Sequence, residues 1–444
     1  MIGPADAVPV RSASPALSVA ALYAAFALCV AVTCFTNDVV LDLVRHQFGF
    51  AANWPTEAAR RLPYAAADRY DGYLLGSLKG AGFFASLLIF AYLLRPAVVA
   101  IWPAIRARRL WIDLLIGVVI AGILLFEVVP GGMGRIYGYV SADPFLQQQG
   151  FFHRRILMPA LAHVLHLDGV LYGVFHWIVA LLSFALASIY LESRGLRLSR
   201  LELASLYTTG MFATGIALPG HGEILVFALT LVALLDHGRG GSNGVVQATC
   251  FALALLSHET AAVLAFGTLA LTCRNRQYPL HFAALFAVYV VIWLASYGFD
   301  FGRATSMQLT GGTSNFERFV ANVPLALFSL FAAYKLTLVA AIAAVARLGR
   351  GGQLRLALLV CIALGGGFAL MAIATDYTRM AAFGGFAILV ALPIALNPLS
   401  VRTRRWLACA NLAIPTVYVG AMHGAVAYNG LYGLVLTAGF GMQR

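Results

Sequence analysis

Three short segments of this sequence place carboxylate, histidine and arginine side chains close together. Two of them join a histidine to a glutamate: Gly220-His221-Gly222-Glu223 and Ser257-His258-Glu259-Thr260. The third, Thr375-Asp376-Tyr377-Thr378-Arg379, sets an aspartate three residues before an arginine. Carboxylates and histidines are the usual general acids and bases of enzymes, and arginine binds anionic groups. The same segments could instead be satisfied polar pairs at the ends of helices.

Carboxylates near the N-terminus could provide a general base. Asp38 stands alone, whereas Asp68 and Asp71 belong to Ala67-Asp68-Arg69-Tyr70-Asp71-Gly72-Tyr73. A carboxylate flanked by aromatic side chains at the edge of an apolar region has its pKa raised, which suits it to remove a proton. The alternative is that Asp68 and Asp71 solvate an interfacial turn and that Asp38 ends a helix.

A further polar stretch combines Asp143, His153 and two adjacent arginines, Arg154 and Arg155. The forked donors of two arginines could clamp a phosphate or pyrophosphate, or could pair with lipid headgroups. Apolar residues at helical spacing predict an amphipathic surface helix over residues 153–167. His163 and His166, within that helix, have a spacing compatible with a metal, but an amphipathic helix explains them as well.

The elements that must position these residues are membrane-spanning. The sequence is 61% hydrophobic and only 11% charged, with a mean hydropathy of +0.84. This composition is typical of a polytopic membrane protein and excludes a soluble core. The net charge of +12 is therefore an orientation signal and not a nucleic-acid footprint, so no nucleic-acid partner is expected.

Arginine clusters recur in alternate gaps between the apolar stretches, and the positive-inside rule makes these gaps cytoplasmic. They are Arg95, Arg106, Arg108 and Arg109; Arg194, Arg197 and Arg200; Arg274 and Arg276; Arg347, Arg350 and Arg355; and Arg402, Arg404 and Arg405. The prediction is a cytoplasmic N-terminus, an outer C-terminus and spans at 16–36, 75–94, 110–129, 169–192, 201–219, 222–236, 244–257, 259–273, 279–299, 324–346, 355–375, 379–397 and 405–428.

We therefore expect an all-α bundle of about 11–13 spans, because three of these segments, within 222–273, are shorter than the roughly 20 residues of a full crossing. Residues 1–444 form a single integral-membrane domain, with outer loops at about 37–74, 130–168 and 300–323 that carry amphipathic helices. Most of the candidate site residues fall on the outer face. Lys335 lies inside a span, where it needs a carboxylate, carbonyl groups or water, or must extend to the interface.

The layout resembles the GT-C superfamily of polytopic glycosyltransferases, which take sugars from polyprenyl-phosphate donors. The resemblance is carried by scattered segments: residues 68–73, Asp143-Pro144-Phe145, His153-Arg154-Arg155-Ile156-Leu157-Met158-Pro159, His258-Glu259-Thr260 and Asp376-Tyr377-Thr378-Arg379. It implies a GT-C-like fold, a first-loop carboxylate as base and outer-face basic residues that hold the donor phosphate. The sequence departs from the family in that the carboxylate close behind the first span is the isolated Asp38, so Asp71, Asp68 and Asp38 all stay candidates.

The expected activity is hexosyl or pentosyl transfer from a lipid-linked donor to an envelope-linked acceptor, in a bacterial inner membrane. Substrate-binding candidates are Asp143, His153, Arg154, Arg155, His221, Glu223, His258, Glu259, Lys335, Asp376 and Arg379. No cofactor is required, although a divalent metal could assist. The alternatives are a transporter or flippase that uses Lys335, Glu223 and His258, and a non-catalytic envelope-assembly protein. The sequence sets no oligomeric state.

Overall fold

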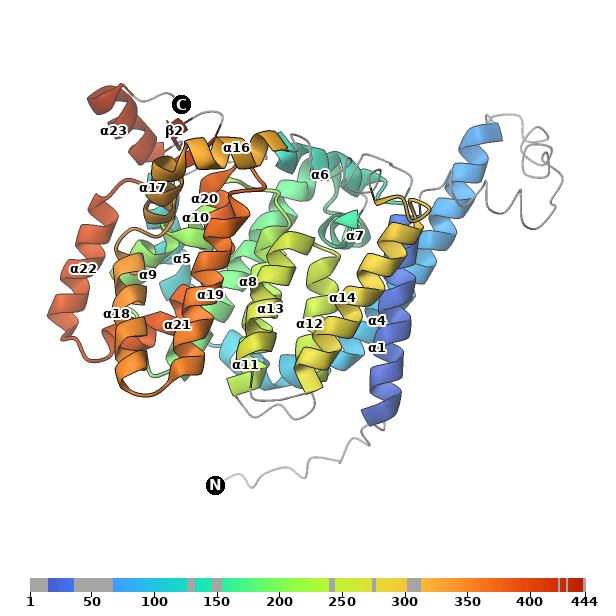
Figure 1. The fold of residues 1–444 in the computed structure, drawn as a ribbon, viewed down its shortest axis with the longest axis horizontal. Helices are drawn as coiled ribbons and strands as arrows, with labels where there is room; N and C mark the ends of the chain where they lie inside the picture. The colour runs from blue at the N-terminus through green and yellow to red at the C-terminus, as the bar shows by residue number, and fades with distance from the viewer. Residues whose placement is uncertain are drawn as a thin grey trace.

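The computed structural model describes residues 15–35, 67–125, 132–145, 154–238, 244–273, 277–301, 313–421, 424–428 and 430–441. The structure is about 81% helical, which confirms the all-α prediction. Most of the longer helices run roughly parallel to one another, and short helices and turns cover the two ends of the bundle (Figure 1). The helix α1 begins at one end of the bundle, and the last helix, α23, lies at the other.

The first half of the chain supplies the helices that run from α1 to α11. They are α1 (Pro15–Cys34), α4 (Ala67–Ile105), α5 (Arg108–Leu125), α6 (Gly132–Ala142), α7 (Leu157–Val164), the 3-10 turn η2 (Gly169–Leu171), α8 (Tyr172–Ser193), α9 (Arg200–Tyr207), α10 (Gly210–Ala217) and α11 (Glu223–Gly238).

The second half supplies further helices and one short antiparallel hairpin. They are α12 (Val245–Leu255), α13 (Glu259–Thr272), α14 (Gln277–Ala295), α16 (Thr313–Ala321), α17 (Val323–Tyr334), α18 (Leu336–Arg350), α19 (Leu354–Leu370), α20 (Tyr377–Ala382), α21 (Gly385–Leu396), α22 (Val401–Ala413), β1 (Val417–Gly420), β2 (Gly424–Ala427) and α23 (Gly430–Phe440). Val417 pairs with Ala427, and Gly420 pairs with Gly424.

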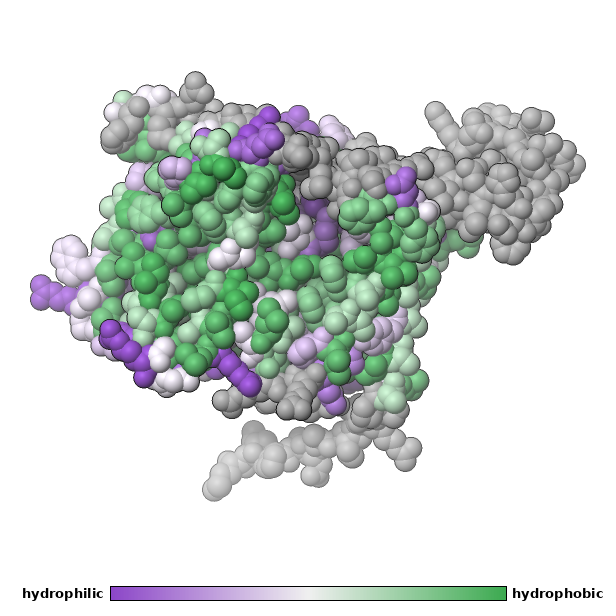
Figure 2. Space-filling model, viewed as in Figure 1, coloured by the Kyte–Doolittle hydropathy of each residue, from purple (hydrophilic) through white to green (hydrophobic). Residues whose placement is uncertain are grey.

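Among the described residues, four helices are long and apolar enough to cross a membrane, and a fifth span results if α16 and α17 are counted as one bent segment. The four lie at Ala16–Cys34, Leu75–Ile105, Gly169–Ser193 and Gln277–Ala295. Figure 2 shows an apolar surface across the middle of the helices, with hydrophilic residues gathered toward their ends. Several helices could thus span a membrane, as in a multi-pass membrane protein.

The predicted spans match the helices best where the sequence seemed weakest. The short segments 222–236, 244–257 and 259–273 correspond to α11, α12 and α13 within about two residues at most ends. A helix of 11 residues, such as α12, reaches only about 16 Å, roughly half the hydrocarbon thickness. The count of eleven to thirteen full crossings therefore stays a prediction.

Three predicted spans are interrupted helices, and the predicted span nearest the C-terminus, 405–428, is wrong. Residues 201–219, 324–346 and 379–397 are divided into α9 and α10, α17 and α18, and α20 and α21. The segment 405–428 is not one helix, because α22 ends at Ala413 and a hairpin follows. Its residues are apolar enough for a span, but Val417, Val419 and their neighbours satisfy their backbone through strand pairing.

Two expectations about the outer loops also need correction. Residues 67–74 are not a loop, because α4 begins at Ala67 and continues for 39 residues, through Pro96 and Pro103. The amphipathic helix expected over 153–167 is limited to α7, which is not a surface helix: Leu157, Met158, Pro159, Ala160 and Ala162 are buried. The apolar residues do lie at helical spacing, but most of them pack against other parts of the protein.

Candidate functional site

A tight turn between α10 and α11 presents His221 and Glu223, and its two glycines make that turn possible. Gly220 has φ +95°, in the left-handed region, and a Cβ there would lie 2.8 Å from the Cα of Gly134. A Cβ on Gly222 would lie 2.8 Å from the carbonyl oxygen of Ser257. Glycine is needed at both positions because backbone packs directly against backbone.

A second turn, between α12 and α13, lies against the first one. Ser257 donates its hydroxyl proton to the carbonyl oxygen of Gly222, at 3.0 Å. His258 caps α13, since its Nδ1 accepts the backbone N–H of Ala261 at 3.4 Å. With Nδ1 accepting, the ring proton is on Nε2, the atom that faces Glu223. The two turns therefore hold both histidines and Glu223 in one place.

The third segment enters from the other side of the network, at the start of α20. Asp376 caps this helix by accepting the backbone N–H of Arg379 at 3.4 Å. The hairpin fixes the segment, because Val419 donates its backbone N–H to the Thr378 hydroxyl at 2.7 Å. Ala421 likewise donates to the carbonyl oxygen of Thr375 at 2.7 Å.

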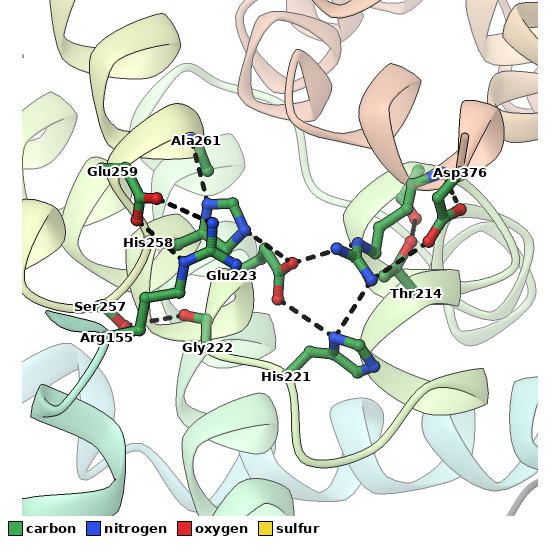
Figure 3. A network of polar contacts seen from close by, with 12 residues as sticks. Arg155, Thr214, His221, Gly222, Glu223, Ser257, His258, Glu259, Ala261 and Asp376 are labelled. Carbon is green, nitrogen blue, oxygen red and sulfur yellow. Dashed lines mark hydrogen bonds and ion pairs between the residues drawn. The ribbon is translucent and has the colours of Figure 1, made fainter. Parts of the chain in front are cut away.

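Glu223 lies at the centre of the resulting network (Figure 3). Its Oε1 is 3.2 Å from Arg379 Nε and 3.3 Å from His258 Nε2, and its Oε2 is 3.7 Å from His221 Nδ1. Arg379 also reaches Asp376, with 3.1 Å between Nη1 and Oδ2. The Glu223 side chain is only 2% exposed. We call Glu223, His221, His258, Asp376 and Arg379 the Glu223 network.

A neighbouring pair extends the network toward α7. Arg155 makes a bidentate contact with Glu259, with its Nε 2.9 Å from Oε2 and its Nη2 2.8 Å from Oε1. Both N–H groups have hydrogen-bond geometry, as expected for a structural fork of an arginine on a carboxylate. By contrast, both oxygens of Glu223, Nε2 of His258 and Nε of Arg379 are buried within ion-pair distance but without hydrogen-bond angles, as far as the described residues go. Buried polar groups without a hydrogen bond are uncommon in folded proteins, and a catalytic role is one explanation for them.

The charges of the Glu223 network depend on burial. Burial lowers the pKa of His221 to about 3 and that of His258 to about 4. Both rings are consequently neutral near pH 7, which leaves Arg379 as the cation that compensates Glu223 within ion-pair distance, among the described residues. Burial raises the pKa of Asp376 even though Arg379 opposes the change, so this carboxyl group binds a proton more readily than an ordinary aspartate.

Arg154, expected in an outer loop, is buried. Its side chain is 1% exposed, and its guanidinium lies 5.5 Å from the ring centroid of Trp293. The two adjacent arginines have different partners, because Arg154 packs on an aromatic ring while Arg155 binds Glu259. Arg154 thus belongs to the protein interior and not to a surface that binds headgroups.

Lys335 lies apart from the Glu223 network, at the break between α17 and α18. Its side chain is fully buried, with Nζ 3.1 Å from the Thr208 hydroxyl and 3.5 Å from the carbonyl oxygen of Asn411. The ring of Tyr432 is 4.8 Å from the same nitrogen. Lys335 therefore binds hydroxyl, carbonyl and aromatic groups inside the protein, and its side chain does not extend to the membrane interface.

Of the remaining candidates, only Asp143 has a described side chain, and it is not part of the Glu223 network. Asp143 is exposed just after α6. The first turns of α4, which carry Asp68 and Asp71, extend beyond the bundle in Figure 1, and the side chains of these two residues lie outside the described part. Asp38 and His153 also lie outside the described residues.

Two tyrosines beside the network were not among the candidates. Tyr137 is 2% exposed, and its ring lies 6.5 Å from that of His221, edge to face. Tyr418, on β1, forms a hydrogen bond with Asp376. The aromatic run around Tyr137 was a visible signal, whereas Tyr418 was hidden in a segment that looked like a span.

Among the described residues, no group of three or more His, Cys, Asp or Glu side chains is arranged to hold a metal ion. His163 Nδ1 instead lies 3.0 Å from Asp168 Oδ2. Comparison of the chain with protein-family models, with curated proteins and with solved structures gave no match. The case for a function therefore depends on the residues and geometry of the chain itself.

Proposed function

We propose that the chain is a multi-pass membrane glycosyltransferase that moves a sugar from a polyprenyl-phosphate donor to a lipid- or envelope-linked acceptor. The observation that carries the proposal is the Glu223 network: ionisable residues from three distant turns meet in a buried cluster at one end of the bundle. Charged groups buried in a membrane protein are costly, and they are typical of substrate sites.

Each residue of the network has a role in this proposal. Asp376 is the general base, because burial raises its pKa toward the working range and its side chain is 18% exposed, far more than Glu223. It removes the proton from the acceptor hydroxyl, whose oxygen bonds to the anomeric carbon. The bond from that carbon to the phosphate oxygen breaks, and polyprenyl phosphate leaves with the electron pair. Arg379 stabilises the charge of the leaving phosphate.

Glu223 and the two histidines position Arg379 and do not react. A guanidinium held at 3.2 Å from Glu223 and 3.1 Å from Asp376 keeps its orientation before the substrate arrives. The incomplete hydrogen bonding of Arg379 Nε favours a phosphate-binding role, because this donor can still form a hydrogen bond with a phosphate oxygen.

The test is transfer by purified protein in liposomes, with a panel of polyprenyl-phosphate sugars and extracted envelope lipids as acceptors. We expect Asp376→Asn and Arg379→Lys each to lower turnover by about two orders of magnitude or more. Arg347→Gln is the control, because the Arg347 side chain donates to the backbone carbonyls of Ile394 and Ala395 and is not part of the Glu223 network. No transfer by the parent protein across the whole panel, or full activity in Asp376→Asn, would contradict the proposal.

A transporter or flippase is the second candidate, favoured by the interrupted helices. Lys335, with φ +50° and ψ −130°, separates α17 from α18, and it contacts Thr208 at the break between α9 and α10. Paired half-helices around a buried cation are typical of transport sites. Substrate flux in liposomes that needs Lys335 and leaves no covalent product would favour this candidate over transfer.

The proposed orientation puts the Glu223 network on the outer face of a bacterial inner membrane, with the N-terminus in the cytoplasm. In a cysteine-free variant, a cysteine at the exposed position 143 should react with an impermeant thiol reagent in intact cells. Cysteines at the exposed positions 107 and 351 should react only after the membrane is opened. The reverse pattern would invert the map, and with it the face that the donor must reach.

A further inference from the structure

A groove with a strongly positive lining opens where α5, α9 and α22 begin. It has a volume of about 1070 Å³, and its lining includes two carboxylates, Asp113 and Glu202, and six arginines: Arg108, Arg109, Arg197, Arg200, Arg404 and Arg405. The ionisable groups of this lining thus carry a net charge of +4. We call this the arginine groove.

The two carboxylates of the arginine groove form ion pairs with only some of its arginines. Asp113 lies 2.8 Å from Arg200 and 3.6 Å from Arg109, and Glu202 lies 3.4 Å from Arg404. Arg108 and Arg405 form no ion pair with a carboxylate in the described part of the chain. Their donors are available to an anion, and both side chains are exposed.

The backbone adds to the positive potential. The helices α5, α9 and α22 begin at Arg108, Arg200 and Val401, and these three residues all line the groove. Helix N-termini carry a partial positive charge and favour anions. Ser199 with Glu202 caps α9 and Ser400 caps α22, so the hydrogen-bond donors for a phosphate group are the arginine forks.

The lining is also partly apolar, which separates this groove from a site for a small soluble anion. Ile112, Leu198, Leu201 and Val401 line it beside the arginines, and Ile112 and Val401 are 41% and 51% exposed. Trp406, on the same helix as Val401, is 67% exposed. Exposed tryptophan beside arginine is typical of the membrane interface, where headgroups meet acyl chains.

The arginine groove and the Glu223 network lie at opposite ends of α8. Tyr172, the first residue of this helix, interacts electrostatically with Glu223. Glu192, near its last residue, lines a cavity that shares Arg109, Asp113 and Arg197 with the groove. A helix of 22 residues is about 33 Å long, so the two sites are separated by roughly the thickness of a bilayer.

We propose that the arginine groove binds the phosphate headgroup of an anionic phospholipid, with the acyl chains leaving along the apolar residues of its lining. The inference does not depend on the proposed glycosyl transfer, because it uses none of the residues of the Glu223 network. On the predicted map this is the cytoplasmic leaflet, where basic pockets at the ends of membrane helices meet anionic lipids.

The test is native mass spectrometry of the purified protein, titrated with phosphatidylglycerol, with phosphatidylcholine and with glycerol phosphate. The variant is Arg108→Gln/Arg405→Gln. The control is Arg350→Gln/Arg355→Gln, which removes the same charge from two exposed arginines that do not line the groove. We expect phosphatidylglycerol to bind in preference to phosphatidylcholine, and the groove variant to weaken that binding about tenfold or more.

Equal weakening in the control would overturn the proposal, because it would indicate only an attraction to net charge. Displacement of phosphatidylglycerol by an equal concentration of glycerol phosphate would also overturn it, in favour of a soluble phosphate ligand. Unchanged helicity by circular dichroism in both variants keeps the result from being an effect on folding.

Discussion

The replacement of Arg379 by glutamine tests whether Glu223 is a buried charge with one main counter-ion. The two side chains are 12% and 2% exposed and lie 3.2 Å apart. At an effective dielectric constant of about 20, two unit charges at that distance attract by about 5 kcal/mol. Removal of one partner from a buried pair usually costs about 3–5 kcal/mol, because the other charge is left without compensation.

We therefore expect Arg379→Gln to lower the free energy of unfolding by about 3–5 kcal/mol. The double variant Glu223→Gln/Arg379→Gln should recover at least about half of that loss, since residue 223 then needs no counter-ion and only Asp376, whose pKa burial raises, still lacks its arginine. The exposed pair of Arg197 and Glu192, 57% and 51% exposed, is the control: Arg197→Gln should change stability by less than about 1 kcal/mol.

The assay is denaturation of the detergent-solubilised protein, followed by far-ultraviolet circular dichroism. A stability of Arg379→Gln within about 1 kcal/mol of the parent protein would show that Glu223 does not depend on this arginine. A double variant that lost as much as Arg379→Gln and Glu223→Gln combined would contradict the pairing as well, because the two side chains would then act independently.

Two further predictions follow from the same turns. The pKa values of His221 and His258 are lowered to about 3 and about 4 in the folded protein. Between about pH 6.5 and about pH 4 these two histidines therefore bind more protons in the unfolded chain than in the folded chain. Their contribution to the free energy of unfolding should fall as the pH drops through that range. Unfolding measured at several pH values should show this slope, and His221→Gln/His258→Gln should flatten it; an equal slope in the double variant would assign it to other groups. Gly222→Ala should destabilise by about 1–3 kcal/mol in the same assay, because its Cβ would lie 2.8 Å from a carbonyl oxygen. Gly365→Ala, where nothing lies within 4 Å, should be neutral or slightly stabilising, and an equal loss in both would show that backbone crowding is not the cause.

Local properties of the sequence determined the class of the protein and much of its secondary structure. Apolar composition and span length are local, so the short segments that became α11, α12 and α13 could be found without any knowledge of their neighbours. The same holds for the polar turns around His221, His258 and Asp376, which interrupt apolar runs. The sequence could show that these residues lie at helix ends, because polar groups inside an apolar helix are costly.

Which of these residues meet depends on contacts between segments that are far apart in the chain. Arg379 reaches Glu223 across 156 positions of the chain, and the contact depends on the hairpin that anchors Thr378. Lys335 was also a candidate for substrate binding, yet it packs against Thr208 and Asn411 instead. Arg154 and Arg155 are neighbours, but one lies on Trp293 and the other on Glu259.

The limits of the sequence have one physical cause. A hydropathy pattern reports how apolar a segment is, but not whether its backbone continues as a helix, since a break is stable wherever another element supplies the missing hydrogen bonds. Asn411 does so at the break before α18, where its Oδ1 accepts the backbone N–H of Leu336 at 2.9 Å. The strand pairing of Val417 with Ala427 does so in the segment that was expected to be a span. The composition is enough to indicate a membrane protein, whereas the helix breaks and the Glu223 network depend on contacts between distant segments.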